Sequence, residues 1–306
     1  MTPKIFLKVL SMSVVSAALV ACALPAATDV PSVSSNLKVI ATFSFIGAFV
    51  QNVGGDKVEV ITLVGPDSDV HDFEPVPSDS GRLAEAQIIF ENGLTLETWL
   101  DNLYTSAESK AMRVVVSEGI TPRKGEEQGE FDPHVWQNPQ NAVVMIKNIA
   151  AALVKADAAN ASTYAANADA YVAKLEALDK EIAAMVERIP ADERKIVTSH
   201  DALGYFAEQY GFTVVGSVIP ALSTEAGDPT AQDVAKIVDA IKAEGVKAIF
   251  LESMANPKLV ERVAQEAGVK VGPELFTDAL GAPGSAGGTY IEALRFNAKT
   301  LVELLK

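Results

Sequence analysis

Short apolar runs alternate with amphipathic stretches over the first part of the chain. Apolar runs bounded by Gly, Pro or Asp favour strands, and apolar positions at a spacing of three or four residues favour helices. The predicted strands are 37–42, 58–64, 88–90 and 113–116, and the predicted helices between them are 45–53, 78–86 and 96–107. Such alternation predicts a parallel sheet with crossover helices on its faces.

The pattern changes in the middle of the chain. Residues 141–188 contain neither glycine nor proline, and apolar residues such as Tyr164 and Tyr171 recur at helical spacing. Pro190 ends this stretch, because a proline cannot continue a helix. The pattern predicts one long helix or two collinear helices, with a break near residues 157–160.

Strand and helix patterns alternate again in the last third of the chain. The predicted strands are 195–198, 213–215, 248–251 and 270–271, and the predicted helices are 202–210, 231–243, 257–267 and 289–305. We therefore predict an α/β protein with two lobes, residues 37–140 and 191–306, each built on a parallel sheet. One long rigid helix over residues 141–190 would join them, with a cleft between the lobes.

A charged and then apolar segment precedes the predicted lobes. Lys4 and Lys8 are followed by apolar and small residues over 9–20, and this run ends just before Cys22. The run is shorter than a typical membrane-spanning helix and has the pattern of a secretory signal peptide. We therefore predict a signal peptide over residues 1–21.

Cys22 is the only cysteine in the chain, and the preceding Leu19-Val20-Ala21 has the form of a lipobox. We predict that Cys22 carries a lipid; an ordinary signal peptide with an incidental cysteine is the alternative. Residues 22–36 are rich in Ala, Pro, Ser and Val, which is typical of a flexible tether. These features predict an extracytoplasmic protein held at a membrane by lipid, in the periplasm or on the outer cell surface.

The charge of the chain excludes some partners. The sequence has 25 basic and 40 acidic residues, which gives a formal net charge of −15 at pH 7. A surface this acidic repels the phosphates of nucleic acids and of anionic membranes. The general attraction of such a surface for cations is weak and screened by salt, so charge alone does not identify a ligand.

Candidate chemistry is concentrated in the only three histidines, His71, His134 and His200. Each lies in a predicted loop next to a strand end or a helix start. In open α/β sheets, ligands bind at that edge. Neutral imidazole is a common metal ligand, and three imidazoles with one carboxylate suit zinc. The alternative is three unrelated histidines, each with local hydrogen bonds.

A carboxylate at another strand end would complete the set. Asp278 follows a short apolar run and precedes a glycine-rich loop. Its alternative role is to cap a turn. Asp72 and Asp201 are rivals because each is adjacent to a histidine, although neighbouring side chains on an extended chain point apart.

Several segments, in order along the chain, resemble motifs of the zinc- and manganese-binding solute-binding lipoproteins of metal ABC importers. They are His71-Asp72-Phe73-Glu74-Pro75, Asn92-Gly93-Leu94 with Glu97-Thr98-Trp99-Leu100-Asp101, Asp132-Pro133-His134-Val135-Trp136, Thr198-Ser199-His200-Asp201-Ala202-Leu203-Gly204-Tyr205-Phe206, Ser223-Thr224-Glu225 and Thr277-Asp278-Ala279-Leu280-Gly281. The resemblance covers nearly all of the predicted mature protein.

The resemblance implies two α/β lobes joined by a long helix, and a metal ion held in the cleft. The ligands that it implies are His71, His134, His200 and Asp278. It also implies that the protein, expected to be a monomer, delivers the ion to a permease in the membrane.

Two departures from the family pattern bear on the metal. Many zinc-binding members carry a loop rich in His and Asp before the second histidine motif, whereas residues 123–130 contain no histidine here. Manganese-binding members usually have a glutamate where this chain has His200.

We predict zinc as the bound metal, because nitrogen donors suit zinc and manganese prefers oxygen. Manganese or iron is the alternative. A metal-dependent hydrolase, with Glu74 or Asp201 as its base, is the remote alternative; we predict no enzyme activity. An added adhesive role at the cell surface is left open. Since the imidazoles must be neutral to bind metal, affinity is expected to fall below about pH 6.5.

Overall fold

The computed structural model describes residues 1–3, 36–125, 129–224, 229–252 and 256–306. The chain divides into residues 1–35 and a folded unit over residues 36–306, and the description below concerns the folded unit. Residues 4–21 of the predicted signal peptide, the lipid site at Cys22 and nearly all of the predicted tether lie outside the described residues. Within the described residues, no helix combines the length and the apolar character needed to cross a membrane.

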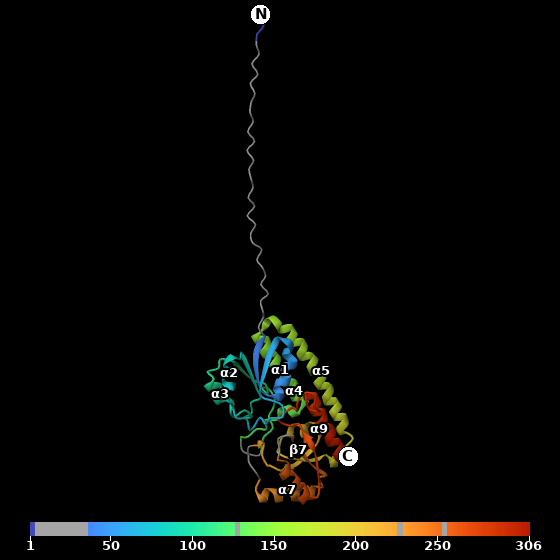
Figure 1. The fold of residues 1–306 in the computed structure, drawn as a ribbon. Coiled ribbons are helices and arrows are strands. Elements are labelled where there is room, and N and C mark those ends of the chain that lie inside the picture. The colour runs from blue at the N-terminus through green and yellow to red at the C-terminus, as the bar shows by residue number, and fades with distance from the viewer. Residues whose placement is uncertain (4–35, 126–128, 225–228, 253–255) are drawn as a thin grey trace. The chain divides into compact units, whose positions relative to one another are not determined.

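The first lobe is built on a parallel sheet of four strands in the order β2-β1-β3-β4 (Figure 1). Its elements are β1 (Leu37–Phe43), α1 (Ser44–Gly54), β2 (Val58–Val64), α2 (Pro77–Glu85), β3 (Ile88–Glu91), α3 (Leu100–Ser106) and β4 (Met112–Val115). The central strands β1 and β3 are almost entirely buried, as expected of a parallel sheet covered on both faces. The strand–helix alternation predicted for this region is confirmed.

Helix α3 is shorter than the helix predicted over residues 96–107. Gly93, Leu94 and Thr95 all have positive φ angles, so the chain turns sharply before the helix. The buried carboxylate of Glu97 accepts the N–H groups of Asn92 at 2.7 Å and Gly93 at 3.0 Å, which fixes this turn. The helix therefore begins only at residue 100.

The second lobe repeats the arrangement, with strands in the order β6-β5-β7-β8. Its elements are β5 (Lys195–Thr198), α6 (Gly204–Tyr210), β6 (Thr213–Ser217), α7 (Ala231–Glu244), β7 (Ala248–Glu252), α8 (Pro257–Ala267), β8 (Lys270–Leu275) and α9 (Tyr290–Leu305). The two-lobed α/β fold predicted from the sequence is thus confirmed. Short 3₁₀ turns lie at Gly55–Lys57, Val135–Gln137, Ala158–Asn160 and Ala191–Glu193.

The segment between the lobes differs from its prediction. It forms two helices, α4 (Pro139–Ala156) and α5 (Ala161–Val186), which lie side by side instead of continuing one another (Figure 1). Gln140, at the start of α4, donates to Asp179, late in α5, at 2.8 Å; collinear helices could not make this bond. The break predicted near residues 157–160 is present, and there the chain reverses direction.

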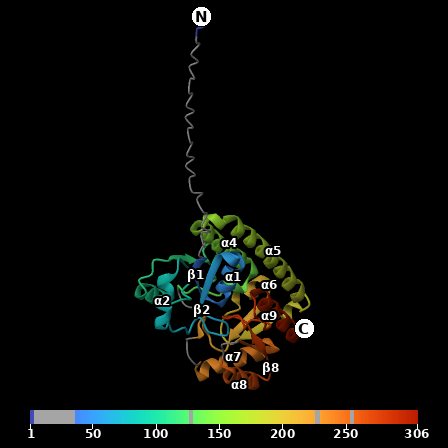
Figure 2. The same ribbon diagram turned by 45° about the horizontal axis from the view of Figure 1, so that its top comes forward.

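Helix α5 contacts both lobes (Figure 2). Near its beginning, Asn167 donates to the carbonyl oxygen of Val53 in α1 at 2.9 Å. Near its end, Glu181 forms two bonds of 2.7 and 2.8 Å with Arg295 of α9. Because the helix is bonded at both ends, it holds the two lobes at a defined separation.

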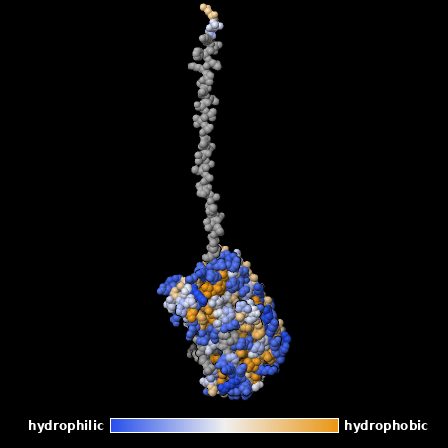
Figure 3. Space-filling model, in the orientation of Figure 1, coloured by the Kyte–Doolittle hydropathy of each residue, from blue (hydrophilic) through white to orange (hydrophobic). Residues whose placement is uncertain are grey.

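Buried polar contacts also join the lobes directly. The indole of Trp136 donates to the carbonyl oxygen of Thr277 at 2.7 Å, and the hydroxyl of Tyr290 donates to the carbonyl oxygen of Trp136 at 2.7 Å. One large apolar core runs through both lobes, and a smaller one lies under α7 and α8. Outside these cores, hydrophilic residues cover much of the face seen in Figure 3.

Candidate metal centre

The four residues predicted as metal ligands come from loops of both lobes. His71 lies in the loop after β2, and His134 immediately precedes the 3₁₀ turn at Val135–Gln137. His200 follows β5, and Asp278 follows β8, in the second lobe. Since the carboxyl ends of parallel strands meet at one sheet edge, both lobes direct these loops into the space between them.

The structure brings these four side chains together. One ligand atom from each residue can be chosen so that all four lie within 4.8 Å of one another. The Nε2 atoms of His71 and His134 are 3.3 Å apart. The carboxylate of Asp278 places Oδ1 3.3 Å from Nε2 of His134 and Oδ2 3.2 Å from Nε2 of His200. A tetrahedron with metal–nitrogen bonds of about 2.0–2.1 Å has edges of roughly 3.3 Å, so these spacings suit one small cation.

All four side chains are buried. Their exposed fractions are 6% for His71, 0% for His134, 1% for His200 and 0% for Asp278. Among the described residues, Nε2 of His200 and Oδ1 of Asp278 make no properly directed hydrogen bond. Buried polar atoms are normally paired, because an unpaired one loses its hydration without compensation. Both atoms can bind a metal ion, and both face the same small space without a hydrogen-bond partner. This is the arrangement expected of a cation site.

His134 is held by a carboxylate that the sequence analysis did not assign. Oδ1 of Asp132 lies 2.8 Å from Nδ1 of His134, which leaves Nε2 directed at the cluster. The other oxygen, Oδ2, accepts from Arg123 at 2.7 Å. The aspartate is part of the second histidine motif, and its position two residues before the histidine was the signal available in the sequence.

His200 is held in the same way by Glu252, the last residue of β7. The carboxylate contacts Nδ1 of His200, and both side chains are 1% exposed. Sequence reasoning missed this residue as well. The available signal was its position directly after the apolar run predicted as a strand, which is the edge where ligands bind.

The loop that carries His71 is fixed from the second lobe. The backbone N–H of His71 donates to Oδ1 of Asp69 at 2.8 Å, and Oδ2 of Asp69 accepts from the hydroxyl of Thr224 at 2.7 Å. Because Thr224 belongs to the second lobe, this aspartate links the His71 loop to the opposite side of the cluster.

The carboxylates raise the basicity of the buried imidazoles. Burial lowers the pKa of His134, but the hydrogen bond with Asp132 and the negative charges of Asp132 and Asp278 outweigh it and raise that pKa to about 9. For His200, burial is likewise outweighed by Glu252 and Asp278, so its pKa is raised. Burial opposes ionisation of Asp278, yet its three histidine neighbours hold its pKa below the ordinary value. Without a metal, the cluster therefore favours protonated His134 and His200 beside an ionised Asp278.

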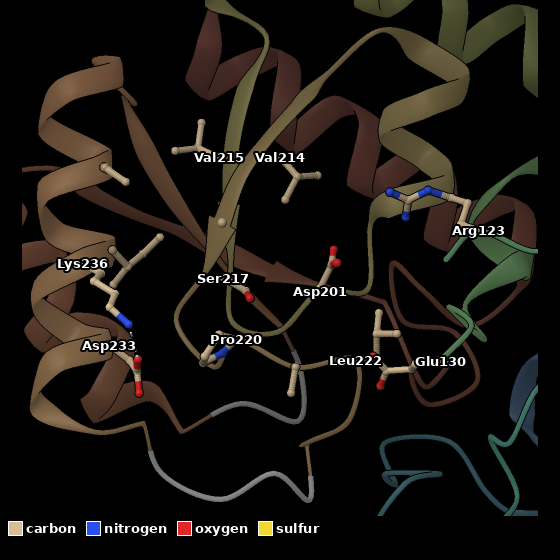
Figure 4. A pocket seen from close by; sticks show the side chains of 14 residues that line it. Arg123, Glu130, Asp201, Val214, Val215, Ser217, Pro220, Leu222, Asp233 and Lys236 are labelled. Atoms are coloured by element: carbon tan, nitrogen blue, oxygen red, sulfur yellow. Dashed lines mark hydrogen bonds and ion pairs between the residues drawn. The ribbon is translucent and has the colours of Figure 1, made fainter. Parts of the chain in front are cut away.

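The rival carboxylates lie outside the cluster. Asp72 and Glu74 are exposed to solvent. Asp201 lines a neighbouring pocket of about 580 Å³, together with Arg123 and the edge strand β6 (Figure 4). Burial raises the pKa of Asp201. As far as the described residues show, none of the four clustered residues lines this pocket, so the pocket and the polar cluster are separate features.

Comparison with known proteins identifies the family. The model of the family described as "Zinc-uptake complex component A periplasmic" matches residues 39–304, and the chain belongs to this family. The iron-binding protein YfeA of Yersinia pestis is 33% identical over 273 residues, which cover 88% of this chain and 86% of YfeA. The manganese-binding lipoprotein MntA of Halalkalibacterium halodurans is 34% identical over 266 residues, which cover 87% of each chain.

Solved structures agree with this family. The periplasmic zinc-binding protein TroA from Treponema pallidum superposes with a TM-score of 0.81 at 30% identity, covering 89% of this chain and 99% of TroA. A manganese-bound mutant of a periplasmic metal-binding protein from Candidatus Liberibacter asiaticus gives the same TM-score at 29% identity, covering 88% of this chain and 99% of that protein. The two-lobed fold of this chain is thus the fold of metal-binding proteins.

Proposed function

We propose that this protein captures a divalent transition metal, preferably zinc, and delivers it to the membrane permease of an ABC importer. The ligands are Nε2 of His71, His134 and His200 and the carboxylate of Asp278. The convergence of these four buried groups within 4.8 Å is the observation that carries the proposal. The relatives whose names describe iron, manganese or zinc binding support the same role.

The ligands divide evenly between the lobes, and this division supplies a way to release the ion. His71 and His134 belong to the first lobe, and His200 and Asp278 belong to the second. An ion with four buried ligands leaves only when some of them move apart. Docking on a permease that separates the lobes would take two ligands from the ion and lower its affinity. The protons favoured on free His134 and His200 would then replace the ion.

The preference for zinc rests on the donor set. Three imidazoles and one carboxylate form a nitrogen-rich site of four ligands, which suits zinc, whereas manganese favours more oxygen ligands. The names of the two relatives described above refer to iron and manganese, so the donor set and these names point to different metals. The substitution His200→Glu tests the preference for zinc over manganese, because it exchanges a nitrogen ligand for an oxygen ligand. It should shift the ratio of affinities from zinc toward manganese.

The hydrolase alternative has little support. A catalytic site needs an open coordination position and a general base beside it. Glu74 is exposed, and neither Glu74 nor Asp201 belongs to the cluster of convergent ligand atoms. The metal site is buried, and its ligands come from both lobes. Such a site suits capture and transfer of an ion better than turnover of a substrate.

The proposed location follows from the N-terminus and the relatives. We retain residues 1–21 as the signal peptide, Cys22 as the lipid site and residues 22–36 as the tether. MntA is described as a lipoprotein and TroA as periplasmic. The protein would act as a monomer outside the cytoplasm, tethered close to its permease.

Metal titration of stripped protein tests this function. A ligand that binds only the folded state adds about 4 kcal/mol of stability at a thousandfold excess over its Kd. Zinc should therefore raise the melting temperature by several degrees, and a chelator should reverse the effect. If zinc, manganese and iron all leave the melting temperature of the stripped protein unchanged, metal capture is not the function.

A further inference from the structure

Glu252 occupies an unusual position behind the cluster. It ends β7, and the register between β7 and β8 shifts between Phe250 and Glu252. Such an irregularity re-aims a side chain, and bulges are common beside functional sites. The backbone N–H of Glu252 donates to the hydroxyl of Ser199 at 3.2 Å, which fixes the strand end against the residue before His200. The carboxylate then contacts Nδ1 of His200.

The two carboxylates that support histidines differ in their own partners. Asp132, behind His134, is paired with Arg123 at 2.7 Å. In the described part of the chain, the only ion pair of Glu252 is between its Oε2 and His200, and its Oε1 has no hydrogen-bond partner. Burial of an ionised carboxylate costs free energy, and Glu252 is 1% exposed with no Lys or Arg beside it. A positive charge nearby would offset that cost.

A bound divalent ion supplies that compensation. Asp278 would bring one negative charge to the ion, and the charges of Asp132 and Arg123 cancel each other. The buried site would then keep one uncompensated positive charge. Glu252 brings the second negative charge without occupying a coordination position, because it lies on the Nδ1 side of His200.

We propose that Glu252 is a positioning residue that sets the metal preference of the site. It holds the proton of His200 on Nδ1, directs Nε2 at the ion and balances the ion's second charge through the imidazole. A carboxylate behind a ligand histidine strengthens that nitrogen as a donor, and zinc depends on nitrogen donors more than manganese does. Glu252 thus favours zinc over manganese. This inference rests on the proposed function.

Glu252→Gln tests the inference, since it removes the charge and nearly preserves the shape. We expect zinc affinity to fall about 10–100-fold, the usual effect of losing such a partner. Manganese affinity should fall less, so the zinc-to-manganese affinity ratio decreases. Glu252→Asp keeps the charge and should recover part of the ratio. Both metals are titrated in one buffer on the purified protein, with circular dichroism of the metal-free variants as a check of the fold.

Glu91→Gln is the matched control. Glu91 ends β3, the strand of the first lobe that corresponds to β7, and it is buried and paired with Arg113 at 2.7 Å. Its neutralisation should lower the melting temperature and leave both metal affinities within about threefold of wild type, because Glu91 supports no metal ligand.

NMR distinguishes an effect of Glu252 on the His200 ring from an effect on the stability of the whole protein. The chain has only three histidines, so the ring protons of the zinc-loaded protein can be assigned by NMR. The proton on Nδ1 of His200 should be seen in wild type and should shift strongly in Glu252→Gln. Unchanged affinities, an equal loss for zinc and manganese, or an unshifted His200 proton would overturn the inference. A wild type that binds neither metal would instead refute the proposed function itself.

Discussion

Oδ1 of Asp132 accepts two hydrogen bonds from His134, one from the backbone N–H at 2.9 Å and one at the ring Nδ1 at 2.8 Å. The two bonds fix both the backbone and the ring of the histidine, so Nε2 has one orientation. Arg123 in turn fixes Asp132 and packs over the ring of Tyr205 in the second lobe. Metal affinity should therefore depend on residues that never touch the ion.

Gly204→Ala is a test of this dependence. A Cβ at this position would lie 1.2 Å from Nη1 of Arg123, so the guanidinium has to leave Asp132. Zinc affinity should fall about tenfold through the loosened His134. Alanine has a higher helix propensity than glycine, so the substitution should not weaken α6. A weaker helix would therefore not explain the loss of zinc affinity. Gly81→Ala, in α2 with no atom within 4 Å of the new Cβ, is the control and should bind like wild type.

Replacing the proposed ligands one at a time should separate them from their neighbours. Alanine at His71, His134, His200 or Asp278 should weaken zinc by more than the 10–100-fold typical of supporting partners. Alanine at the exposed Glu74 should leave zinc affinity unchanged. Competition with a chelator of known affinity gives each value. Normal zinc binding by the Asp278 variant would remove that residue from the ligand set.

Zinc affinity should fall as the pH falls, and the decline should begin at a higher pH than expected from the sequence. Burial lowers the pKa of His134, but Asp132 and Asp278 raise it to about 9 in the metal-free protein. Zinc must displace that proton at any pH below about 9, so affinity should decline from there and not only below 6.5. Zinc titrations across this range measure the slope. Constant affinity from pH 9 down to 6.5 would contradict the raised pKa.

The same pKa shift predicts the opposite trend for the stability of the metal-free protein. A folded-state pKa raised from 6.5 to about 9 adds stability that is complete below 6.5 and is lost as pH rises through about 9. The melting temperature in chelator should therefore fall between these values, while the stabilisation by zinc grows. Parallel melting curves with chelator and with zinc test both signs together.

The lipid anchor is tested separately, because Cys22 lies outside the described residues. Cys22→Ser should abolish lipid attachment and release the protein from membranes in soluble form. Stable anchoring of this kind takes more than one acyl chain, so mass spectrometry of the wild type should find several. A wild type that carries no lipid and fractionates like the variant would contradict the lipobox assignment.

Local sequence patterns located the strands and most helices, and β2 and β5 have the predicted bounds, although α3 begins later than predicted. The packing of α4 against α5 was not predictable, because the pattern locates a break and does not give the direction of the chain after it. The role of Glu252 was hidden for a similar reason. Its contact with His200 depends on β7 pairing with β5, and the order of strands in a sheet is not a local property. The four candidate ligands were found because each lies in a recognisable motif.

The most direct test of the central claim is the position of the ion. Crystals of the zinc-loaded protein, measured at the zinc absorption edge, should give one strong anomalous peak inside the cluster. We expect it about 2.0–2.1 Å from Nε2 of His71, His134 and His200 and about 2.0–2.2 Å from a carboxylate oxygen of Asp278. A peak elsewhere on the protein, with these four side chains unliganded, would contradict the account.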